Sequence, residues 1–310
     1  MANAEAGTPR LPTELEREIF EQAASHSEGT AFSLLTVSKR VHEWIEPTLY
    51  RVIVQRSVDL SSDSTKSSPF FTRLFEGYRA QSPSSLRQVS FVKAVVVNLN
   101  EEVTDLICTI LDACPNVIDL ALWTSYDELV WDKLLGISDK PLQKLSMHAG
   151  VDKVPPIFSP SSRLNSTLTH LDFFDVNVNY TLSTDTWPTW WWKDFINSLP
   201  RLTYFAIDGN DLEDIIKLVL DESPSLELLV LVSIYHAELE GIKALDDSDL
   251  IPLPLFTQDP RFVYVPAPEE VLDVWVSGAR GGRDVWTMGQ DLQKQKIERL
   301  RQHRLLEDCH

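Results

Sequence analysis

The chain has 310 residues, of which 43% are hydrophobic and 9% aromatic, a composition typical of a folded protein. Lysine and arginine number 28 and aspartate and glutamate 46, so the formal net charge at pH 7 is −18. This charge repels phosphate backbones and anionic lipid headgroups, which excludes nucleic acid and acidic membranes as expected partners. The three cysteines are too few for a disulfide framework, the N-terminal stretch MANAEAGTPR contains no apolar run that could serve as a signal peptide, and no apolar run is long enough to predict a membrane span. We therefore expect a soluble protein of the cytoplasm or the nucleus.

The stretch LPTELEREIF, residues 11–20, carries the signals of a helix start. Thr13 and Glu16 have the spacing of a capping box, in which each side chain satisfies a free backbone N–H group near the other. Leu15 and Ile19 begin an apolar stripe that is flanked by charged side chains. The pattern predicts an amphipathic helix that begins at Thr13.

The polar segment SHSEGT, residues 25–30, predicts the end of this first helix. A second helical pattern runs from Phe32 to Ile45 with a break near Ser38, and Pro47 is expected to end it. A segment of about forty residues can rarely bury its own apolar side chains without a partner. We therefore expect part of its surface to meet another protein or the rest of the chain.

The run LPTELEREIF, followed by SLLTVSKRVHEWIEPTLYRVIV, resembles an F-box. The residues that match the F-box pattern, in chain order, are Leu11, Pro12, Glu14, Leu15, Ile19, Leu35, Val37, Ser38, Lys39, Trp44, Leu49 and Tyr50. The resemblance implies a three-helix module that binds a Skp-type adaptor and, through it, a cullin-based ubiquitin ligase. The residues expected to contact the adaptor are Leu11, Pro12, Leu15, Ile19, Leu34, Leu35, Val37 and Trp44.

A short pattern recurs beyond residue 80, with apolar residues at positions +0, +3 and +5. Its copies are LRQVSF from Leu86, VIDLAL from Val117, LQKLSM from Leu142, LTHLDF from Leu168, LTYFAI from Leu202 and LELLVL from Leu226, with an earlier copy, LYRVIV, from Leu49. Each copy alternates like a strand, and helical patterns such as EEVTDLICTILDA and DLEDIIKLVLDE lie between copies. This alternation predicts a leucine-rich-repeat solenoid of the α/β class, with parallel strands inside and helices outside. A doubly wound α/β sheet is the alternative.

The chain as a whole resembles the F-box proteins with degenerate leucine-rich repeats that are abundant in fungi. Later sequence segments such as NVIDLALW and GARGGRDVW fit the same family. The predicted organisation is a disordered N-terminus at 1–10, an F-box-like helical module at 11–50, a linker and first repeat at 51–85, the solenoid at 86–276, and a C-terminal loop and helix at 277–310.

Positions +2, +4 and +6 of each copy are expected to face the concave side of the solenoid. The expected contacts to a protein target are the aromatic side chains of these rows with one carboxylate: Trp123, His148, Phe174, Tyr204 and Asp208. The alternative is an aromatic layer that the C-terminal segment covers. The same rows also hold Asp119, Lys144, Ser146, His170 and Asp172.

Three later segments have structural explanations. The strand LELLVLV is apolar on both faces, and the expected cover is the C-terminal segment with Phe262, Val263, Val265 and Trp275. In TWPTWWWKDF the stripe of Trp191, Phe195 and Leu199 predicts core packing and leaves Trp190 exposed. GARGG is expected to be a loop before the final helix, QDLQKQKIERLRQHR, which we expect to be solvated.

No catalytic constellation is found in the sequence. HEWIE has Glu46 where a zinc protease helix needs its second histidine, and the chain has no Cys-x-x-Cys pair, Gly-x-Ser-x-Gly motif or Walker loop. We therefore predict a non-enzyme without metal or cofactor. The expected function is that of the substrate-recognition subunit of a Skp/cullin-type ubiquitin ligase, which binds the adaptor through the F-box and an unknown protein target through the solenoid. The alternative is a non-ligase, protein-binding scaffold in which the N-terminal helices are a structural cap.

Overall fold

The computed structural model describes residues 11–56, 69–98, 104–124, 128–136, 141–148, 164–177, 189–210, 212–233, 258–268 and 270–307. In this part of the chain, eight strands form one parallel sheet whose order equals their order in the sequence. The strands are β1 (Val52–Arg56), β2 (Ala94–Asn98), β3 (Asp119–Leu122), β4 (Lys144–His148), β5 (His170–Asn177), β6 (Tyr204–Asn210), β7 (Leu228–Ser233) and β8 (Phe262–Pro266). The predicted disordered segment, 1–10, lies outside the described residues.

Twelve helices accompany the sheet in the described residues. They are α1 (Thr13–His26), α2 (Glu28–Leu34), α3 (Lys39–Tyr50), α4 (Pro69–Arg79), α5 (Pro83–Phe91), α6 (Thr104–Ala113), α7 (Glu128–Gly136), α8 (Leu164–Thr167), α9 (Thr189–Asn197), α10 (Glu213–Glu222), α12 (Val271–Ala279) and α13 (Val285–Glu307). No helix of the described segments is both long and apolar enough to cross a bilayer.

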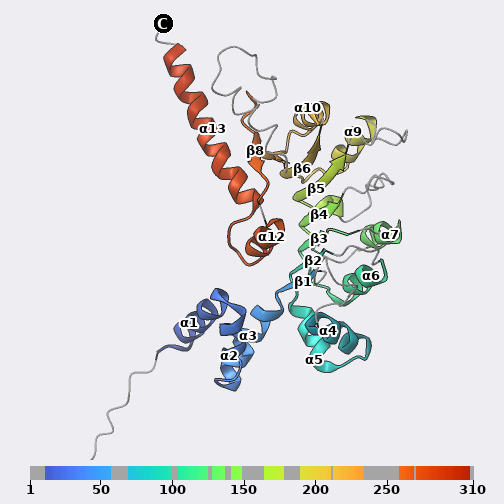
Figure 1. Cartoon of the computed structure of the whole chain (residues 1–310), viewed down its shortest axis with the longest axis vertical. Coiled ribbons are helices and arrows are strands. Elements are labelled where there is room, and N and C mark those ends of the chain that lie inside the picture. Colours follow the sequence, from blue (N-terminus) through green and yellow to red (C-terminus); the bar gives the residue numbers. More distant parts are fainter. Residues whose placement is uncertain are drawn as a thin grey trace, which may run out of the picture.

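The layers follow the chain order (Figure 1). The helices between successive strands, from α4 to α10, lie along one face of the sheet, whereas α12 and α13 lie on the opposite face. Helices α1 to α3 stand beyond β1 at one end of the sheet. Because each strand pairs with the next one in the sequence, the sheet lacks the order reversal of the doubly wound alternative. An α/β fold with sequential parallel strands and with the helices between them on one face agrees with the solenoid prediction.

The strand register places equivalent repeat positions side by side. Asp119 is paired with Lys144, Lys144 with His170, and His170 with Tyr204, so the +2 positions form one continuous row. The +3 and +5 side chains, such as Leu145 and Met147, are buried in the main core between the sheet and the helices. The predicted assignment of core and concave positions is therefore confirmed for the described side chains of the copies from Val117 onward.

The first two copies of the repeat were misplaced. LRQVSF lies in α5, and the neighbouring strand is instead β2, whose Ala94 pairs with Asp119. Apolar residues three positions apart, such as Leu86 and Val89, also fit one face of a helix. Pro83 in the first turn favours a helix here. In β1, Val52 pairs with Ala94, so the repeat copy LYRVIV was assigned one residue out of register. As a result, Ile53 rather than Val52 belongs to the main core.

Helices α1 to α3 form a separate small core of Ala24, Ala31, Val41 and Ile45. The predicted capping box is not formed, because Pro12 is the N-cap residue and Thr13 already lies within α1. The Glu16 carboxylate instead accepts a hydrogen bond from Arg40 of α3. The break near Ser38 is confirmed, since its hydroxyl caps α3 at the Val41 N–H group.

Two other boundaries in this module differ from the prediction. Pro47 lies inside α3, which continues to Tyr50, although proline was expected to end the helix. The SHSEGT break is also shorter than predicted, because Ser27 alone separates α1 from α2. The Ser27 hydroxyl accepts a hydrogen bond from the Thr30 N–H group and so starts α2 within the polar segment. Because Ser27 caps α2, the two helices are joined by this one residue and not by the six-residue loop that the sequence predicted.

The tryptophan-rich segment packs as expected. Trp191 stacks on Phe195 with ring centroids 4.6 Å apart, and Leu199 is buried in the same core. Trp190 is 62% exposed. GARGG was predicted as a loop, but its Gly278 and Ala279 form the last residues of α12, and only Arg280 to Gly282 belong to the connection to α13.

The C-terminal helix is not the solvated terminus that its polar sequence suggested. Met288 and Leu292 of α13 pack against the concave side of the sheet, and Lys296 Nζ donates to the carbonyl groups of Asp259 and Phe262, each at 2.7 Å. Phe262 and its neighbours form strand β8, so the cover of β7 consists mainly of α13. The first half of α13 is therefore part of the packed structure.

Candidate functional site

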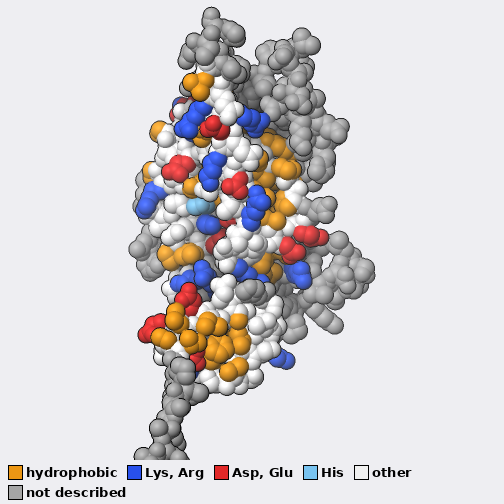
Figure 2. Space-filling model, turned by 90° about the vertical axis from the view of Figure 1, so that its left-hand side faces the viewer, with side chains coloured by type: hydrophobic (Ala, Val, Ile, Leu, Met, Phe, Trp, Pro, Cys, Tyr) orange, Lys and Arg blue, Asp and Glu red, His pale blue; other side chains and the backbone are white. Residues whose placement is uncertain are grey.

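The first candidate site is the outer surface of α1, α2 and the residues that flank these two helices. Five large hydrophobic side chains are exposed there, and we call them the N-terminal apolar surface: Leu11 (58% exposed), Leu15 (47%), Ile19 (55%), Phe32 (52%) and Val37 (56%). Figure 2 shows hydrophobic side chains gathered on this end of the molecule. Contiguous apolar patches of this kind mark interaction surfaces, whereas single exposed hydrophobic residues need no explanation.

The residues predicted to contact an adaptor divide into two groups. Leu11, Pro12, Leu15, Ile19 and Val37 are exposed. The other three are half-buried against the core of the helical module itself: Leu34, Leu35 and Trp44. Phe32 was not predicted as a contact, although its place at the start of the second helical pattern marked it as apolar.

The helical module is attached to the solenoid through a buried carboxylate. Glu46 of α3 is buried, and its Oε2 atom lies 2.9 Å from Nη2 of Arg87 on α5. Gln88 Nε2 donates to the other carboxylate oxygen of Glu46 at 3.3 Å. The module therefore also closes the end of the sheet that begins with β1.

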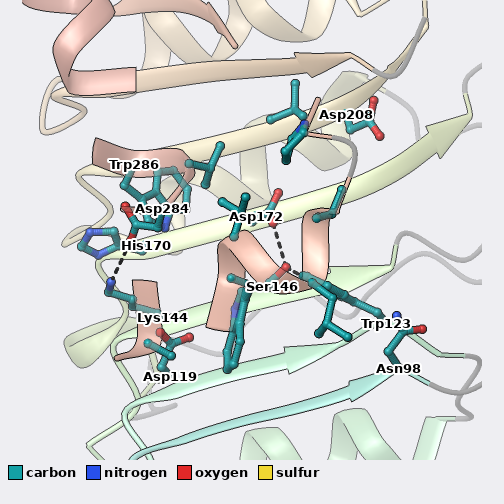
Figure 3. Close-up of a pocket in the computed structure, with 18 of the residues that line it drawn as sticks. Asn98, Asp119, Trp123, Lys144, Ser146, His170, Asp172, Asp208, Asp284 and Trp286 are labelled. Atoms are coloured by element: carbon teal, nitrogen blue, oxygen red, sulfur yellow. Dashed lines mark hydrogen bonds and ion pairs between the residues drawn. The ribbon is translucent and has the colours of Figure 1, made fainter. Parts of the chain in front are cut away.

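The second candidate site is a cavity of about 610 Å³ between strands β3 to β6 and the C-terminal segment. We call it the concave chamber. Its polar walls come from the sheet and the loop before α13: Asp119, Lys144, Ser146, His170, Asp172, Asp208 and Asp284. Its aromatic walls are Trp123, Trp275 and Trp286. Figure 3 shows Trp123, Ser146 and Asp172 side by side across neighbouring strands and Lys144 beside Asp284, with Asp208 set apart from them.

One end of the chamber holds the single basic side chain that lines it within the described residues. Lys144 Nζ lies 3.7 Å from Asp284 Oδ2. Burial raises the pKa of the neighbouring Asp119 carboxyl to about 7, although Lys144 acts against this shift. Burial also lowers the pKa of His170 to about 4, with a further contribution from Lys144, so His170 is neutral at pH 7.

The other end contains a chain of hydrogen bonds. Trp123 Nε1 donates to Ser146 Oγ at 2.8 Å, and Ser146 Oγ donates to Asp172 Oδ2 at 2.7 Å (Figure 3). Burial raises the pKa of Asp172 to about 7, the Ser146 hydrogen bond opposes this, and the charge of Asp208 adds to it. Asp172 is therefore a carboxyl group poised between its two protonation states near neutral pH.

The predicted target contacts lie beneath or beside the C-terminal segment. The Trp123 ring meets Trp275 of α12 with centroids 6.4 Å apart. Tyr204 stacks on His170, and its hydroxyl oxygen accepts a hydrogen bond from Gln290 of α13. Asp208 is buried in the chamber wall. The remaining two residues, His148 and Phe174, occupy strands β4 and β5, and their side chains lie outside the described part of the structure.

Among the described residues that line the chamber, no nucleophile is activated by histidine. The Ser146 proton is committed to Asp172, while His170 Nδ1 lies 2.8 Å from the Thr169 hydroxyl oxygen. Within the described residues, no group of three histidine, cysteine, aspartate or glutamate side chains has a geometry that could hold a metal ion. The arrangement is suited to binding a ligand by charge and aromatic contact.

Five polar residues of the chamber were present in the +2 and +4 rows but were not chosen as site residues: Asp119, Lys144, Ser146, His170 and Asp172. Asp208 was chosen. The in-register alignment of Asp119 with Lys144 could have shown that charges meet on the concave side. Asp284 and Trp286 reach the chamber only through the fold of the C-terminal segment. No protein-family model matches the chain, and a search of curated proteins finds no match.

Proposed function

We propose that the chain is the substrate-recognition subunit of a Skp/cullin-type ubiquitin ligase. Helices α1 to α3 act as its F-box and bind the adaptor, and the leucine-rich-repeat-like solenoid carries a protein target. The observation that supports this most strongly is the N-terminal apolar surface, five exposed hydrophobic side chains on a module that already has its own core.

The energetics favour a partner on this surface. Burying one large aliphatic side chain contributes about 1.5–3 kcal/mol, and Leu15 and Ile19 are each about half exposed in the chain alone. The two side chains lie four residues apart on one face of α1, so a single protein partner could bury both and release the water that covers them. The adaptor-binding hypothesis accounts for this unburied face without a change in the module.

The proposed mechanism is proximity rather than chemistry by this chain. The adaptor and cullin hold the chain next to a ubiquitin-charged enzyme, and the solenoid holds the target, so the transfer becomes effectively intramolecular. This role requires no catalytic group in the chain.

A second candidate function is a protein-binding scaffold in which α1 to α3 serve only as a cap. The observation in its favour is the Glu46–Arg87 contact, which joins the module to the first helices of the solenoid. Solenoids need such caps to shield the exposed end of their core. The two functions differ in what the exposed apolar side chains do.

The test is binding of the full chain to a purified Skp-type adaptor, measured by isothermal titration calorimetry. The double variant Leu15→Ala with Ile19→Ala is expected to weaken binding at least roughly tenfold, which corresponds to about 1.4 kcal/mol, at unchanged thermal stability. The control is Leu129→Ala, which removes a leucine of similar exposure on α7. Absence of binding by the unaltered chain would exclude the ligase proposal, and a double variant that loses stability instead would support the cap.

A further inference from the structure

We propose that the concave chamber binds a small aromatic molecule that carries a hydrogen-bond donor, such as an indole or a phenol. In this proposal the ring of the ligand packs against Trp123 and Trp275, and its N–H or O–H group donates to the carboxylate of Asp172. The site is separate from the N-terminal apolar surface, so this inference does not depend on adaptor binding.

The first argument is the reason why the fold leaves a space here. The +4 positions of β3 to β6 are paired across the sheet and carry short side chains: Ala121, Ser146, Asp172 and Ala206. The next positions on either side, Val96 and Val230, belong to two separate apolar clusters. Helix α12 packs on the first cluster and α13 on the second. Residues of both helices line the chamber, and the short side chains of the row between the clusters do not fill it.

The second argument is the exposure of α12. This helix is rich in apolar side chains, yet none of its nine residues is buried. Leu272, Val274 and Trp275 line the chamber, and Val271 is 45% exposed. Apolar surface that borders a cavity of this size keeps its contact with water. A ligand with an apolar body would displace that water and so bury part of α12.

The third argument is the aromatic corner formed by two tryptophans. Trp123 Nε1 donates to Ser146 Oγ at 2.8 Å, which fixes the orientation of this indole (Figure 3). Trp275 meets it with an interplanar angle of 76° and ring centroids 6.4 Å apart. Aromatic rings favour edge-on and offset-stacked contacts with centroids about 4.5–7 Å apart. A flat ring in this corner can make one contact of each kind.

The fourth argument is the hydrogen bonding of Asp172. Ser146 Oγ donates to Asp172 Oδ2 at 2.7 Å, and in the part of the chain that the structure describes no donor meets the other oxygen, Oδ1. Burial raises the pKa of this carboxyl to about 7, because the group has lost much of its hydration. A polar group that leaves water is costly unless its hydrogen bonds are replaced. An N–H or O–H group of a ligand at Oδ1 would replace one of them.

Size and charge separate this ligand from other classes. The cavity of about 610 Å³ falls within the range of small-molecule sites, roughly 300–1,000 Å³. Among the described residues that line it, the one lysine or arginine is Lys144, whose Nζ atom lies 3.7 Å from Asp284 Oδ2. An anionic ligand would therefore meet the carboxylates of the walls without a cation of its own and is disfavoured.

The test uses indole and benzofuran, titrated separately into the full chain by calorimetry. Benzofuran has the same two fused rings with an oxygen in place of the N–H group, so it matches indole in size and lacks the donor. We expect indole to bind with a dissociation constant below roughly 1 mM, an affinity within the range for ligands of its size. Benzofuran is expected to bind at least about fivefold more weakly. No binding of indole at roughly 10 mM, or equal affinity for the two probes, would overturn the proposal.

Variants locate the site within the chamber. The Ser146 hydroxyl accepts from Trp123 and donates to residue 172, so in Asp172→Asn the amide oxygen faces Ser146 and the NH2 group faces the ligand. This variant is expected to lose the preference, with affinities for indole and benzofuran within about twofold of each other. Trp275→Leu removes the ring and is expected to weaken both probes at least about fivefold. Asp132→Asn, on the exposed surface of α7, is the matched control and should change neither affinity.

One further control separates the chamber from the N-terminal apolar surface, which also exposes hydrophobic side chains. The double variant Leu15→Ala with Ile19→Ala is expected to bind indole as the unaltered chain does, whatever its affinity for an adaptor. Retained far-ultraviolet circular dichroism shows that each variant is folded. Loss of indole binding in this double variant, or an unchanged preference for indole in a folded Asp172→Asn variant, would contradict the placement.

Discussion

The indole ring of Trp286 meets the imidazole ring of His170 edge-on, with ring centroids 5.3 Å apart and an interplanar angle of 77°. Trp286 belongs to the C-terminal helix α13, whereas His170 begins strand β5 in the middle of the sheet. The same indole also lies edge-on to Tyr204 of β6. The C-terminal segment is therefore packed into the concave face as part of the core, and it closes one side of the concave chamber.

Replacing Trp286 with alanine is expected to destabilise the chain by about 3–5 kcal/mol, because the ring is 9% exposed and its removal leaves a cavity between α13 and the sheet. Urea denaturation, followed by circular dichroism, measures this change. The matched control is Trp190→Ala, which removes the same ring from an exposed position on α9 and is expected to cost far less. Equal effects of the two substitutions would contradict the packing of α13.

Gly289 allows the close approach of α13 to the sheet. A Cβ atom at this position would lie 2.9 Å from Val230 Cγ2 and 3.1 Å from Leu228 Cδ2. Gly289→Leu is expected to destabilise the chain by about 1–3 kcal/mol or more through overpacking, despite the better helix propensity of leucine. The control is Gly29→Leu in α2, where no atom lies within 4 Å of the added Cβ and a gain of up to about 1 kcal/mol is expected. A stabilising effect at Gly289 would show that α13 does not rest on β7.

The repeat in the sequence predicted the sheet where inward and outward positions differed clearly. Leu120 and Leu145 are buried on the helical side, and the aligned Asp119 and Lys144 face the concave side, so the period of two was unambiguous. LRQVSF failed because Leu86 and Val89 are three residues apart, which fits a helix equally well. Local apolar spacing alone does not distinguish these cases in so short a segment.

The candidate sites were predictable to different degrees. Leu15 and Ile19 were expected to be exposed because a short helical module has more apolar side chains than its core can bury. The concave chamber could not be predicted, because it depends on where α13 lies along the sheet. That position is determined by contacts such as Gly289 with Val230, between residues that are far apart in the sequence.

Stability is expected to fall as pH rises from about 6.5 to 8. The pKa values of Asp119 and Asp172 are raised to about 7 in the folded chain, so below that pH the folded state binds more protons than the unfolded state, and deprotonation removes this advantage. The contribution of His170 to the pH dependence of stability has the opposite sign, because its pKa is lowered. It affects stability only between about pH 4 and pH 6.5. The expected loss over pH 6.5–8 is about 1 kcal/mol for each aspartate, measured by urea denaturation at several pH values.

The variant Asp172→Asn separates the two aspartates. It is expected to reduce the decrease over this pH range by about half, because Asp119 still titrates and the asparagine does not. Asp132→Asn, at an exposed position, serves as the control and should leave the pH dependence unchanged. A pH profile of Asp172→Asn identical to that of the unaltered chain would mean that the Asp172 pKa is not raised.

Arg261 fixes strand β8 to the end of helix α10. Its Nη2 atom donates to the carbonyl oxygen of Leu220 at 2.8 Å, and its Nη1 atom donates to that of Ser223 at 3.2 Å. The same guanidinium group donates to the Asp259 carboxylate, so one planar group satisfies three acceptors.

Lysine cannot reproduce this geometry, and Arg261→Lys is expected to destabilise the chain by about 1.5–3 kcal/mol. The same substitution at Arg17, whose Nε atom pairs with Glu21 on the exposed surface of α1, is expected to change stability by less than about 0.5 kcal/mol. Amide hydrogen exchange measures the local effect, which should be faster exchange in α10 and β8 for the Arg261 variant. Unchanged exchange there would show that the hydrogen bonds of Arg261 do not hold the last strand in place, since losing them would then leave both elements as protected as before.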